Sequence, residues 1–441
     1  MVIMTATKPY RVVELFSGIG AQRMALDRAR IPYEVVGICD IDPFANLSYE
    51  AIHGKTPMLG EFKDSKGRTC GDVTKIKHLP KNVDILTYSF PCTDLSVANT
   101  RGKGFKGEHS GLLWAVKDIL DQAQKDNNLP RYLIMENVPQ VFSEANRRDG
   151  NRWLRYLDSL GYTSKSGCLN AKDFRHTGQN RNRAFMISHL GDDCPDLPIG
   201  TGGDYVLADL LDDKVDSKYY LTKSRVAGAK KSSRKEAKRG NGVKFEPLDP
   251  HKSVARTVTT NEGHVKTSSY VDTTRCHHVG NVGGMSSYES TRRVYSKNGL
   301  CPTITTNSGG GNEAKVLEGR STIRRLTPRE TWRAQSFSRK KRDGTWDDSA
   351  FEKAQAAVVA KSKDGADITM SDRQLYAQSG NSINVNVMKE IFRKIDKFDD
   401  KGKIKKPKKS VAKTKPSAKM TKTKTPNPIK PKKSTKNVET D

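Results

Sequence analysis

Short apolar runs alternate with longer amphipathic stretches over the first 190 residues of the chain. The apolar runs hold four or five residues each, which is typical of buried strands, and they cover residues 12–16, 35–39, 83–87, 132–135 and 184–188. The stretches between them have helical periodicity and cover residues 21–30, 45–52, 112–126 and 153–160. This alternation predicts an α/β domain in which helices cover a parallel sheet.

The pattern changes after about residue 190. Gly, Asp, Ser and Thr then mix with β-branched residues, which predicts a second, irregular domain rich in β-structure, with strands at 254–260 and 302–306. Helical order resumes at 324–335, where Thr327, Pro328 and Glu330 have the types and spacing of a helix start. Further helices are expected at 351–360 and 385–395. The Lys-rich, low-complexity end of the chain is expected to be disordered.

The net charge of the 441-residue chain is +28, which points to a polyanionic partner such as nucleic acid. This excess is unevenly spread. Residues 401–441 carry +13 and residues 223–244 carry +8, which leaves +7 for the rest. The basic tail therefore predicts sequence-independent attraction to phosphates, and the 223–244 stretch is either a second arm that faces nucleic acid or a solvated linker.

Composition argues against several other classes of protein. No stretch approaches the roughly 18 to 20 consecutive apolar residues of a membrane helix, and the first residues lack the order of a signal peptide, so we expect an intracellular protein with no membrane partner. The seven scattered cysteines form no C-x-x-C pair, which argues against disulfides and a cysteine zinc site. His277 and His278 lack further ligands at suitable spacing, so no metal site is predicted.

Candidate cofactor residues follow the first strands. Phe16, Ser17, Gly18, Ile19 and Gly20 join the first strand to the first helix, where glycines allow a tight turn and close approach of a ligand. Asp40 ends the second strand region and Asp72 follows further on, and carboxylates at such positions can bind ribose hydroxyls or an adenine edge. Each feature alone also fits an ordinary loop or cap. Together and in this order they favour a nucleoside-containing cofactor.

Two candidate reactive groups follow later strands. Cys92 comes after the strand at 83–87, directly after Pro91, and Glu136 comes after the strand at 132–135. Both are therefore expected at the carboxyl edge of the parallel sheet, where such sheets place their sites. The simpler alternatives are a half-buried free thiol and a helix cap.

Gln179, Arg181 and Arg183 alternate along an extended segment just before the strand at 184–188. They are therefore expected to share one face. Paired arginines near a site hold carboxylates, phosphates or base carbonyls. A solvated strand face is the simpler alternative.

The order of these motifs resembles that of the DNA (cytosine-5) methyltransferase family, of bacterial or viral type, from about residue 10 to 395. The matching segments are a cofactor loop at 12–20, Pro91-Cys92, Glu136-Asn137-Val138, Gln179-x-Arg181-x-Arg183, 325–330 followed by 335–337, and Gly380-Asn381-Ser382. Thr93 stands where the family commonly has Gln, and Ser336 stands where it usually has Gly.

The resemblance implies methyl transfer from S-adenosylmethionine to C5 of a cytosine flipped out of duplex DNA. The Cys92 thiolate would add to C6, and Glu136 would protonate or hydrogen-bond N3. Arg181 would hold the base carbonyl, while Gln179 and Arg183 would position the loop. The resemblance also implies a cofactor pocket lined by Phe16, Ser17, Gly18, Ile19, Gly20, Asp40, Ile41, Asp72, Val73, Pro91, Leu112, Asn381 and Ser382.

The resemblance also divides the chain. It implies a Rossmann-like S-adenosylmethionine-dependent catalytic domain at 1–190, an inserted β-rich target-recognition domain at 191–320, a part that completes the catalytic domain at 321–397, and a disordered basic tail at 398–441. Candidate DNA contacts are residues 288–295, with Arg292 and Arg293, and residues 307–312. We expect a monomer associated with DNA that acts on a short CG or GC site.

Two alternatives to this function remain open from the sequence. The same chemistry could act on tRNA, although the Cys-Phe-Thr signature of that branch is absent from the middle segment. The chain could instead be a catalytically silent DNA-binding protein that keeps the fold. The presence of Cys92, Glu136, Gln179, Arg181 and Arg183 argues against silence.

Overall fold

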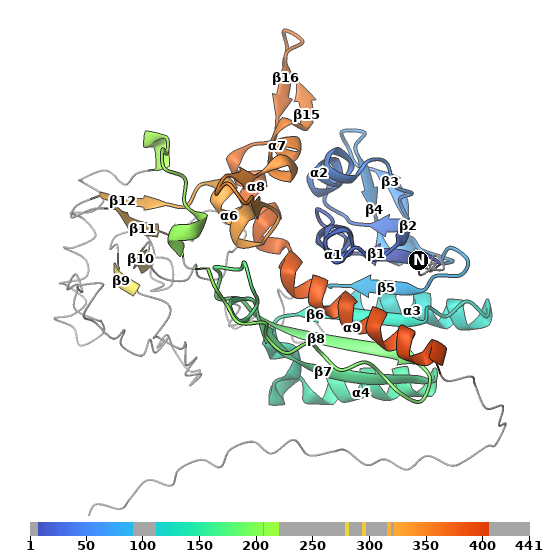
Figure 1. Cartoon of the computed structure of the whole chain (residues 1–441). Helices are drawn as coiled ribbons and strands as arrows, with labels where there is room; N and C mark the ends of the chain where they lie inside the picture. The colour runs from blue at the N-terminus through green and yellow to red at the C-terminus, as the bar shows by residue number, and fades with distance from the viewer. Residues whose placement is uncertain are drawn as a thin grey trace, which may run out of the picture. The chain divides into compact units, whose positions relative to one another are not determined.

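A six-stranded sheet with the strand order β2-β1-β5-β6-β8-β7 carries the predicted site residues (Figure 1). This computed structural model describes residues 8–90, 112–205, 207–219, 278–281, 293–296, 315–318 and 322–404. The strands are β1 (Tyr10–Leu15), β2 (Tyr33–Cys39), β5 (Ile85–Tyr88), β6 (Tyr132–Asn137), β7 (Tyr162–Asn170) and β8 (Asn182–Leu190). β2, β1, β5 and β6 are parallel, whereas β8 is antiparallel to β6 and β7 is antiparallel to β8. The predicted α/β class is therefore confirmed, but the sheet is parallel in four strands only.

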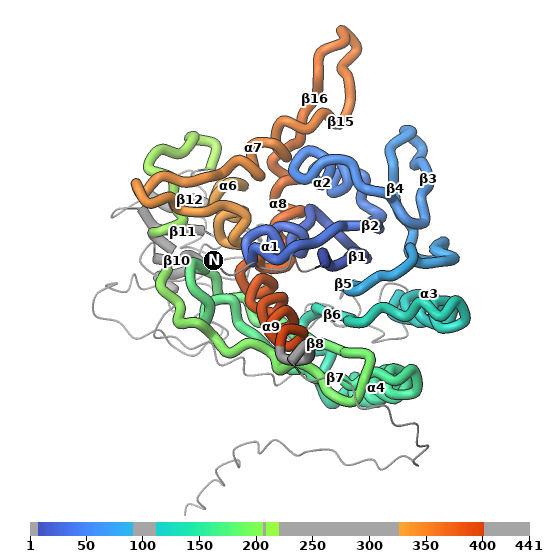
Figure 2. Tube along the Cα trace, turned by 45° about the vertical axis from the view of Figure 1, so that its right-hand side comes forward, coloured from blue at the N-terminus to red at the C-terminus, as the bar shows by residue number. Residues whose placement is uncertain are grey.

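Helices cover both faces of this sheet (Figures 1 and 2). One face packs against α1 (Ala21–Ala29), α2 (Pro43–His53) and α9 (Val385–Ile404), and the other packs against α3 (Leu112–Lys125) and α4 (Arg147–Ser159). Side chains alternate between the two cores along each strand, so Val12 and Ile134 lie in the first core while Val13 and Leu133 lie in the second. Each core is apolar and buried, which fixes the register of the strands.

The segment after residue 325 begins with a capped helix, as the sequence predicts. In α6 (Pro328–Ala334), the Glu330 backbone N–H donates to Thr327 Oγ1 and the Thr327 N–H donates to Glu330 Oε2, at 3.2 and 2.8 Å. The remaining elements are the hairpin β13 (Arg339–Lys340) and β14 (Trp346–Asp347), α7 (Ser349–Ala356), the hairpin β15 (Val358–Lys361) and β16 (Asp367–Thr369), and α8 (Asp372–Asn381). The helix predicted at 351–360 is wrong at its end, because β15 replaces its last turn.

Four further strands form a separate sheet in the order β12-β11-β10-β9. They are β9 (His278–Asn281), β10 (Arg293–Ser296), β11 (Lys315–Glu318) and β12 (Thr322–Arg325). Three of these strands lie within the predicted middle domain, and β12 follows it and occupies residues 324 and 325, where the sequence predicted the start of a helix. The strands predicted at 254–260 and 302–306 lie outside the described residues, as do residues 223–244 and the tail beyond Ile404.

The change of pattern at residue 190 is not a boundary in packing. Cys194 is buried in the core beneath α9. Further on, the Asp212 backbone N–H donates to Glu330 Oε1 at 2.8 Å, and Arg333 Nη1 donates to the Leu210 carbonyl at 3.1 Å. The first part of the predicted middle domain therefore packs on the same body as α6. None of the helices in the described ranges is long and apolar enough to cross a membrane.

Candidate active site

Glu136 lies near the end of β6, on the sheet face that α9 covers. Ile134 and Tyr132, two and four residues earlier, belong to the core on that face, and alternation along the strand places Glu136 on the same side. Only 8% of Glu136 is exposed. Glu136 pairs with Phe185 on the neighbouring strand β8, and Phe185 lies two residues from Arg183. The strand pairing thus brings two residues of separate sequence motifs together.

Arg183 is the cation that faces Glu136. Its Nε lies 3.4 Å from Glu136 Oε1. Burial raises the pKa of Glu136, and the charges of Arg183 and Arg181 offset part of this rise. A carboxyl group with a raised pKa holds a proton more readily near neutral pH than an exposed glutamate does, so it can donate a hydrogen bond to a ring nitrogen.

Arg181, in contrast, donates hydrogen bonds to backbone carbonyl groups of the protein. Its Nη2 donates to the carbonyl oxygens of Gly380 and Ser382 at 3.1 and 2.8 Å, and only 4% of the residue is exposed. The sequence assigned the base carbonyl to Arg181 and the positioning of the loop to Arg183. These contacts favour the opposite assignment, because Arg181 holds two backbone carbonyls while Arg183 faces the buried acid.

Gln179 is fully buried on the same segment, and among the described residues neither its Oε1 nor its Nε2 has a hydrogen-bond partner. A buried amide left in this state costs about 1–3 kcal/mol. The segment is also fixed from β7, since Asn170 Oδ1 accepts from the Arg181 backbone N–H at 3.0 Å. The structure therefore brings Gln179, Arg181 and Arg183 together at this edge of the sheet.

Asn137 holds the backbone just before the predicted nucleophile, a role that sequence reasoning missed. Its Nδ2 donates to the carbonyl oxygen of Phe90 at 3.0 Å, and its Oδ1 accepts from the Val138 N–H at 2.8 Å. Phe90 is the last described residue before Pro91, Cys92 and Thr93, which lie outside the described ranges. Membership of Asn137 in the Glu-Asn-Val motif was the only sequence signal for it.

The predicted cofactor loop between β1 and α1 has a left-handed backbone at three positions. Phe16, Gly18 and Gly20 have φ values of 56°, 53° and 78°. A Cβ atom on Gly20 would lie 2.4 Å from His53 Nε2, so this position also has no room for a larger residue. The Ser17 N–H donates to the Cys39 carbonyl at 3.1 Å, which fixes the loop against β2.

Asp40 holds this loop from the end of β2. Its Oδ2 accepts from the Gly18 N–H at 2.7 Å, and its Oδ1 accepts from the Asp42 N–H at 2.9 Å. Burial raises the pKa of Asp40 to about 6, although both hydrogen bonds lower it. In this arrangement Asp40 shapes the loop with its side chain.

Asp72 is brought beside Asp40, because the Gly71 N–H donates to the Asp40 carbonyl at 2.7 Å. Its Oδ1 accepts from the N–H and hydroxyl of Thr74, at 3.0 and 2.6 Å, at the start of a single 3₁₀ turn, Val73–Lys75. Partial burial tends to raise the pKa of Asp72, but the bonds from Thr74 lower it overall. The bonds from Thr74 to Asp72 fit the simpler expectation of a loop cap. The second carboxylate oxygen of Asp72, Oδ2, lies 3.7 Å from Lys75 Nζ.

The other predicted cofactor residues differ in exposure. Ile41 is 61% exposed beside Asp40, and Val73 is buried. Leu112 begins α3, Asn381 ends α8 and Ser382 follows it with 7% exposure. The Arg181 bonds tie this last segment to the edge that carries Arg183.

These residues fit a nucleoside-containing cofactor. The Ser17 Oγ is buried and has no hydrogen-bond partner in the part of the chain that the structure describes, and buried hydroxyls are normally paired. The exposed Ile41 offers an apolar surface next to the Asp40 and Asp72 carboxyl groups. A polar ligand with an apolar ring system would satisfy both features.

A buried acid that the sequence did not single out lies on β1 just before the loop. Glu14 is fully buried, and its Oε2 accepts from the Tyr49 hydroxyl at 2.7 Å. Burial raises the pKa of Glu14 to about 7. His53 is on the same helix as Tyr49 and lies 3.2 Å from the Ile19 carbonyl through Nε2. An acid inside the apolar run 12–16 was the sequence signal for this cluster.

The predicted DNA contacts lie mostly outside the described residues. Residues 288–292 and 307–312 are not described, and for Arg293 the structure gives only its place in β10. His278 begins β9, and His277 is not described. Within the described ranges, no group of three or more His, Cys, Asp or Glu side chains could hold a metal ion.

Comparison with known families gives a match over most of the chain. Residues 10–397 match the family model for C-5 cytosine-specific DNA methylase. Among similar proteins, the Type II methyltransferase M2.ScrFI of Lactococcus lactis subsp. cremoris is 29% identical over 435 residues, which cover 88% of this chain and 99% of that protein. The Orphan methyltransferase M.SssI of Spiroplasma monobiae is 29% identical over 444 residues, with 88% and 98% covered.

Two solved structures are similar in fold. The S. pombe Dnmt2 methyltransferase has 19% identity and a TM-score of 0.54, with 88% of this chain and 99% of that chain covered. The Entamoeba histolytica methyltransferase EhMeth has 16% identity and a TM-score of 0.56, with 89% and 99% covered. At these identities the likeness concerns the fold alone.

Proposed function

The chain belongs to the C-5 cytosine-specific DNA methylase family, and from that premise we propose that it methylates a flipped-out cytosine through a covalent bond between Cys92 and C6. It is a DNA (cytosine-5) methyltransferase that uses S-adenosylmethionine as methyl donor. The observation that best supports the proposed mechanism is the ion pair of the buried Glu136 with the partly buried Arg183, whose Nε lies 3.4 Å from Glu136 Oε1. Asn137, next to Glu136, holds the Phe90 carbonyl two residues before Cys92.

The proposed chemistry solves the poor nucleophilicity of cytosine C5. A lone pair of the Cys92 thiolate forms a bond to C6, and the electrons of the C5–C6 double bond become available at C5 for attack on a methyl carbon. S-adenosylmethionine, when bound, would supply that methyl group from its positively charged sulfur, which would keep the electron pair of the broken carbon–sulfur bond and leave as neutral S-adenosylhomocysteine. Water accepts the C5 proton, the C5–C6 double bond re-forms, and the bond to Cys92 breaks. The thiolate is thereby regenerated.

Glu136 and Arg183 act on the polar edge of the ring in this proposal. A protonated Glu136 donates to N3, which lowers the energy of the electron-rich ring formed when Cys92 adds. Arg183 balances the carboxylate that remains after proton transfer and holds the base carbonyl. The base must leave the helix for C6 to be reached, at a cost of a few kcal/mol that contacts with the protein offset.

The methyl donor is held by the loop after β1 in this proposal. The Ser17 hydroxyl, which has no hydrogen-bond partner among the described residues, would form a hydrogen bond with the methyl donor. Asp40 keeps the Gly18 backbone in place, and Asp72 offers its second carboxylate oxygen to the methyl donor. Ser382 lies at the far end of the chain, where the Arg181 bonds keep it near this edge of the sheet. Residues 321–397 would thus complete a catalytic domain that begins with residues 1–190.

The remaining assignments concern DNA recognition. We assign residues 191–320 to target recognition, with 191–219 as a connection packed on the catalytic body, and residues 398–441 to sequence-independent DNA binding. The protein would act as a monomer on duplex DNA.

A methyl-transfer assay tests this function. The protein is incubated with S-adenosylmethionine labelled in its methyl group and with either duplex DNA or tRNA, and Cys92→Ala serves as the variant. We expect label on DNA, none on tRNA, and none with the variant. Label on tRNA alone, or full transfer by Cys92→Ala, would overturn the proposal.

A further inference from the structure

A cleft of about 350 Å³ lies at the start of α9, outside the site described above. One wall is the segment before Gln179, with Arg175 and His176. The other wall is the first three turns of α9, with Asn386, Lys389, Glu390 and Arg393. Neither wall carries a residue assigned to the base or to the methyl donor.

Positive charge exceeds negative charge around this cleft. Glu390 is shared between two cations, since its Oε1 lies 3.3 Å from Lys389 Nζ and 2.8 Å from Arg393 Nη1. The Arg175 side chain is exposed and forms no hydrogen bond or ion pair among the described residues. One carboxylate therefore faces three cations, which leaves a surplus of two positive charges. His176 has a separate partner, Asp204, at 3.2 Å.

Lys389 is the most confined of these cations, with 16% of its side chain exposed. Burial lowers the pKa of Lys389, Glu390 raises it, and the charges of Arg393 and Arg28 lower it further. Repulsion of this kind in a partly buried place is relieved by a bound anion. Part of the surplus positive charge therefore lies inside the cleft, at Lys389, and not only at its exposed rim.

The cleft lies at the same edge of the sheet as Glu136. Asn386 Nδ2 donates to the carbonyls of Arg175 and His176 at 3.2 Å each, so α9 is fixed to the segment that leads to Arg183. Arg183 lies eight positions after Arg175, and this segment spans at most about 28 Å when extended. A duplex bound at the site carries phosphates on both strands over such a distance.

We propose that this cleft binds a backbone phosphate of the DNA strand that flanks the target cytosine. Guanidinium and ammonium groups are the usual partners of phosphate oxygens, and such contacts fix the register of a protein on the duplex. The contact goes beyond the proposed covalent chemistry, and it rests on duplex DNA as the substrate. The cleft is larger than one phosphate, so a neighbouring sugar can enter it as well.

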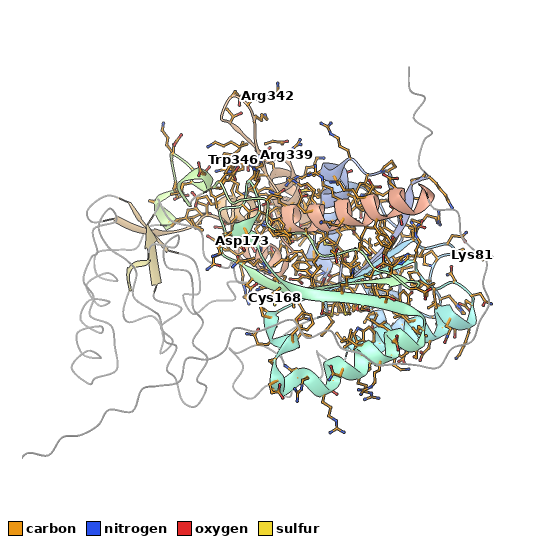
Figure 3. The ribbon with its side chains drawn as sticks, turned by 60° about the horizontal axis from the view of Figure 1, so that its bottom comes forward. Lys81, Cys168, Asp173, Arg339, Arg342 and Trp346 are labelled. Carbon is orange, nitrogen blue, oxygen red and sulfur yellow. The ribbon has the colours of Figure 1, made fainter. Side chains whose placement is uncertain are left out.

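The salt dependence of DNA binding tests this assignment. Dissociation constants for a duplex are measured from about 50 to 200 mM NaCl for the wild type, Arg175→Ala and Lys81→Ala, since each bound phosphate adds about 0.9 to the slope of log K against log salt. Lys81 is an exposed cation before β5, and Figure 3 shows it at the far end of the body from Asp173, which lies two residues before Arg175. Both variants lose one positive charge.

We expect Arg175→Ala to weaken binding about 5- to 10-fold at low salt and to reduce the slope by about 0.9, while Lys81→Ala behaves like the wild type. Equal effects of the two substitutions would overturn the proposal, because net charge alone would then explain them. A second arm measures the melting temperature with inorganic phosphate. The proposal is wrong if phosphate stabilises the wild type but not Arg175→Ala while the two proteins have the same salt slope for DNA binding. The cleft would then be a site for small anions. If the wild type transfers no methyl group but the salt slopes are as expected, the catalytic mechanism is wrong and the phosphate contact stands.

Discussion

Arg181 donates a hydrogen bond of 2.8 Å to the carbonyl oxygen of Ser382, across 201 residues of sequence. The same nitrogen donates to the Gly380 carbonyl. These bonds fasten the end of α8 to the segment that carries Arg183, so the predicted cofactor residue Ser382 and the proposed base-binding residue Arg183 share one support. The contact explains why a segment near the end of the chain belongs to the catalytic body.

Replacement of Arg181 by Ala should destabilise the fold. Two buried carbonyls lose a charged donor, and we expect the free energy of unfolding to fall by about 2–4 kcal/mol. Chemical denaturation followed by circular dichroism measures this change. An unfolding midpoint equal to that of the wild type would show that Arg181 does not support the site.

Replacement of Arg183 by Ala should instead impair catalysis. Its side chain is 18% exposed and its ion pair is with Glu136 alone among the described residues, so the free energy of unfolding should change by less than about 1 kcal/mol. We expect turnover to fall by about 100-fold or more, because a preorganised charge next to the base is lost. The assignment would be reversed if Arg183→Ala kept its turnover while a stably folded Arg181→Ala lost it.

Asn137→Ala should lower turnover more than it weakens DNA binding. The substitution removes the donor that holds the Phe90 carbonyl, and misplacement of a catalytic loop by about 1 Å can cost about 100-fold in rate. Steady-state kinetics should show a reduced kcat with a KM for DNA close to that of the wild type. A change confined to KM would argue that Asn137 acts on DNA binding instead.

The two loop glycines offer a matched test of the cofactor site. A Cβ atom on Gly18 meets nothing within 4 Å, so Gly18→Ala should cost only the strain of a left-handed backbone, about 1–2 kcal/mol. Gly20→Ala adds a clash with His53, which is held by Ile19. Calorimetric titration with S-adenosylhomocysteine should show weaker binding for Gly20→Ala than for Gly18→Ala. Equal affinities would mean that the loop tolerates movement of His53.

Glu14 should make the stability of the protein depend on pH. Because burial raises its pKa from 4.5 to about 7 in the folded protein, its contribution to stability is complete below about pH 4.5 and is lost as the pH rises through about 7. The wild type should therefore lose up to about 3 kcal/mol over this range relative to Glu14→Gln. Denaturation at pH 5.5 and 8 captures about 2 kcal/mol of this difference, with the exposed Glu34→Gln as control. Parallel behaviour of Glu14→Gln and the wild type would contradict the buried, protonated state.

The sequence predicted the strands of the core but not the whole sheet. β1, β5 and β6 are mostly apolar because almost all of their residues, on both faces, are buried. β7 was missed, since Tyr162–Asn170 is an edge strand in which Thr, Ser, Lys and Gly replace most apolar residues. The antiparallel direction of β8 also could not be predicted, because an apolar run does not encode the direction of its neighbour.

The candidate site was predicted as a set of motifs but not as a geometry. Glu136 and Arg183 were both singled out, and the strand pairing of β6 and β8 brings them together. The hydrogen bonds of Arg181 to the Gly380 and Ser382 carbonyls could not be predicted, because these partners lie 199 and 201 residues away. Alternation along a strand predicts a shared face, and it does not tell which side chain contacts a distant carbonyl.

The central claim, that Cys92 forms a covalent bond with the target base, is tested most directly with duplex DNA that contains 5-fluorocytosine. The fluorine at C5 replaces the proton that must be removed after methyl transfer, and it cannot be removed in the same way. The bond between Cys92 and C6 therefore cannot break. With S-adenosylmethionine present, denaturing electrophoresis should show a protein–DNA complex, and peptide mass analysis should place the adduct on Cys92. Recovery of free protein only, or an adduct on another residue, would contradict the proposed mechanism.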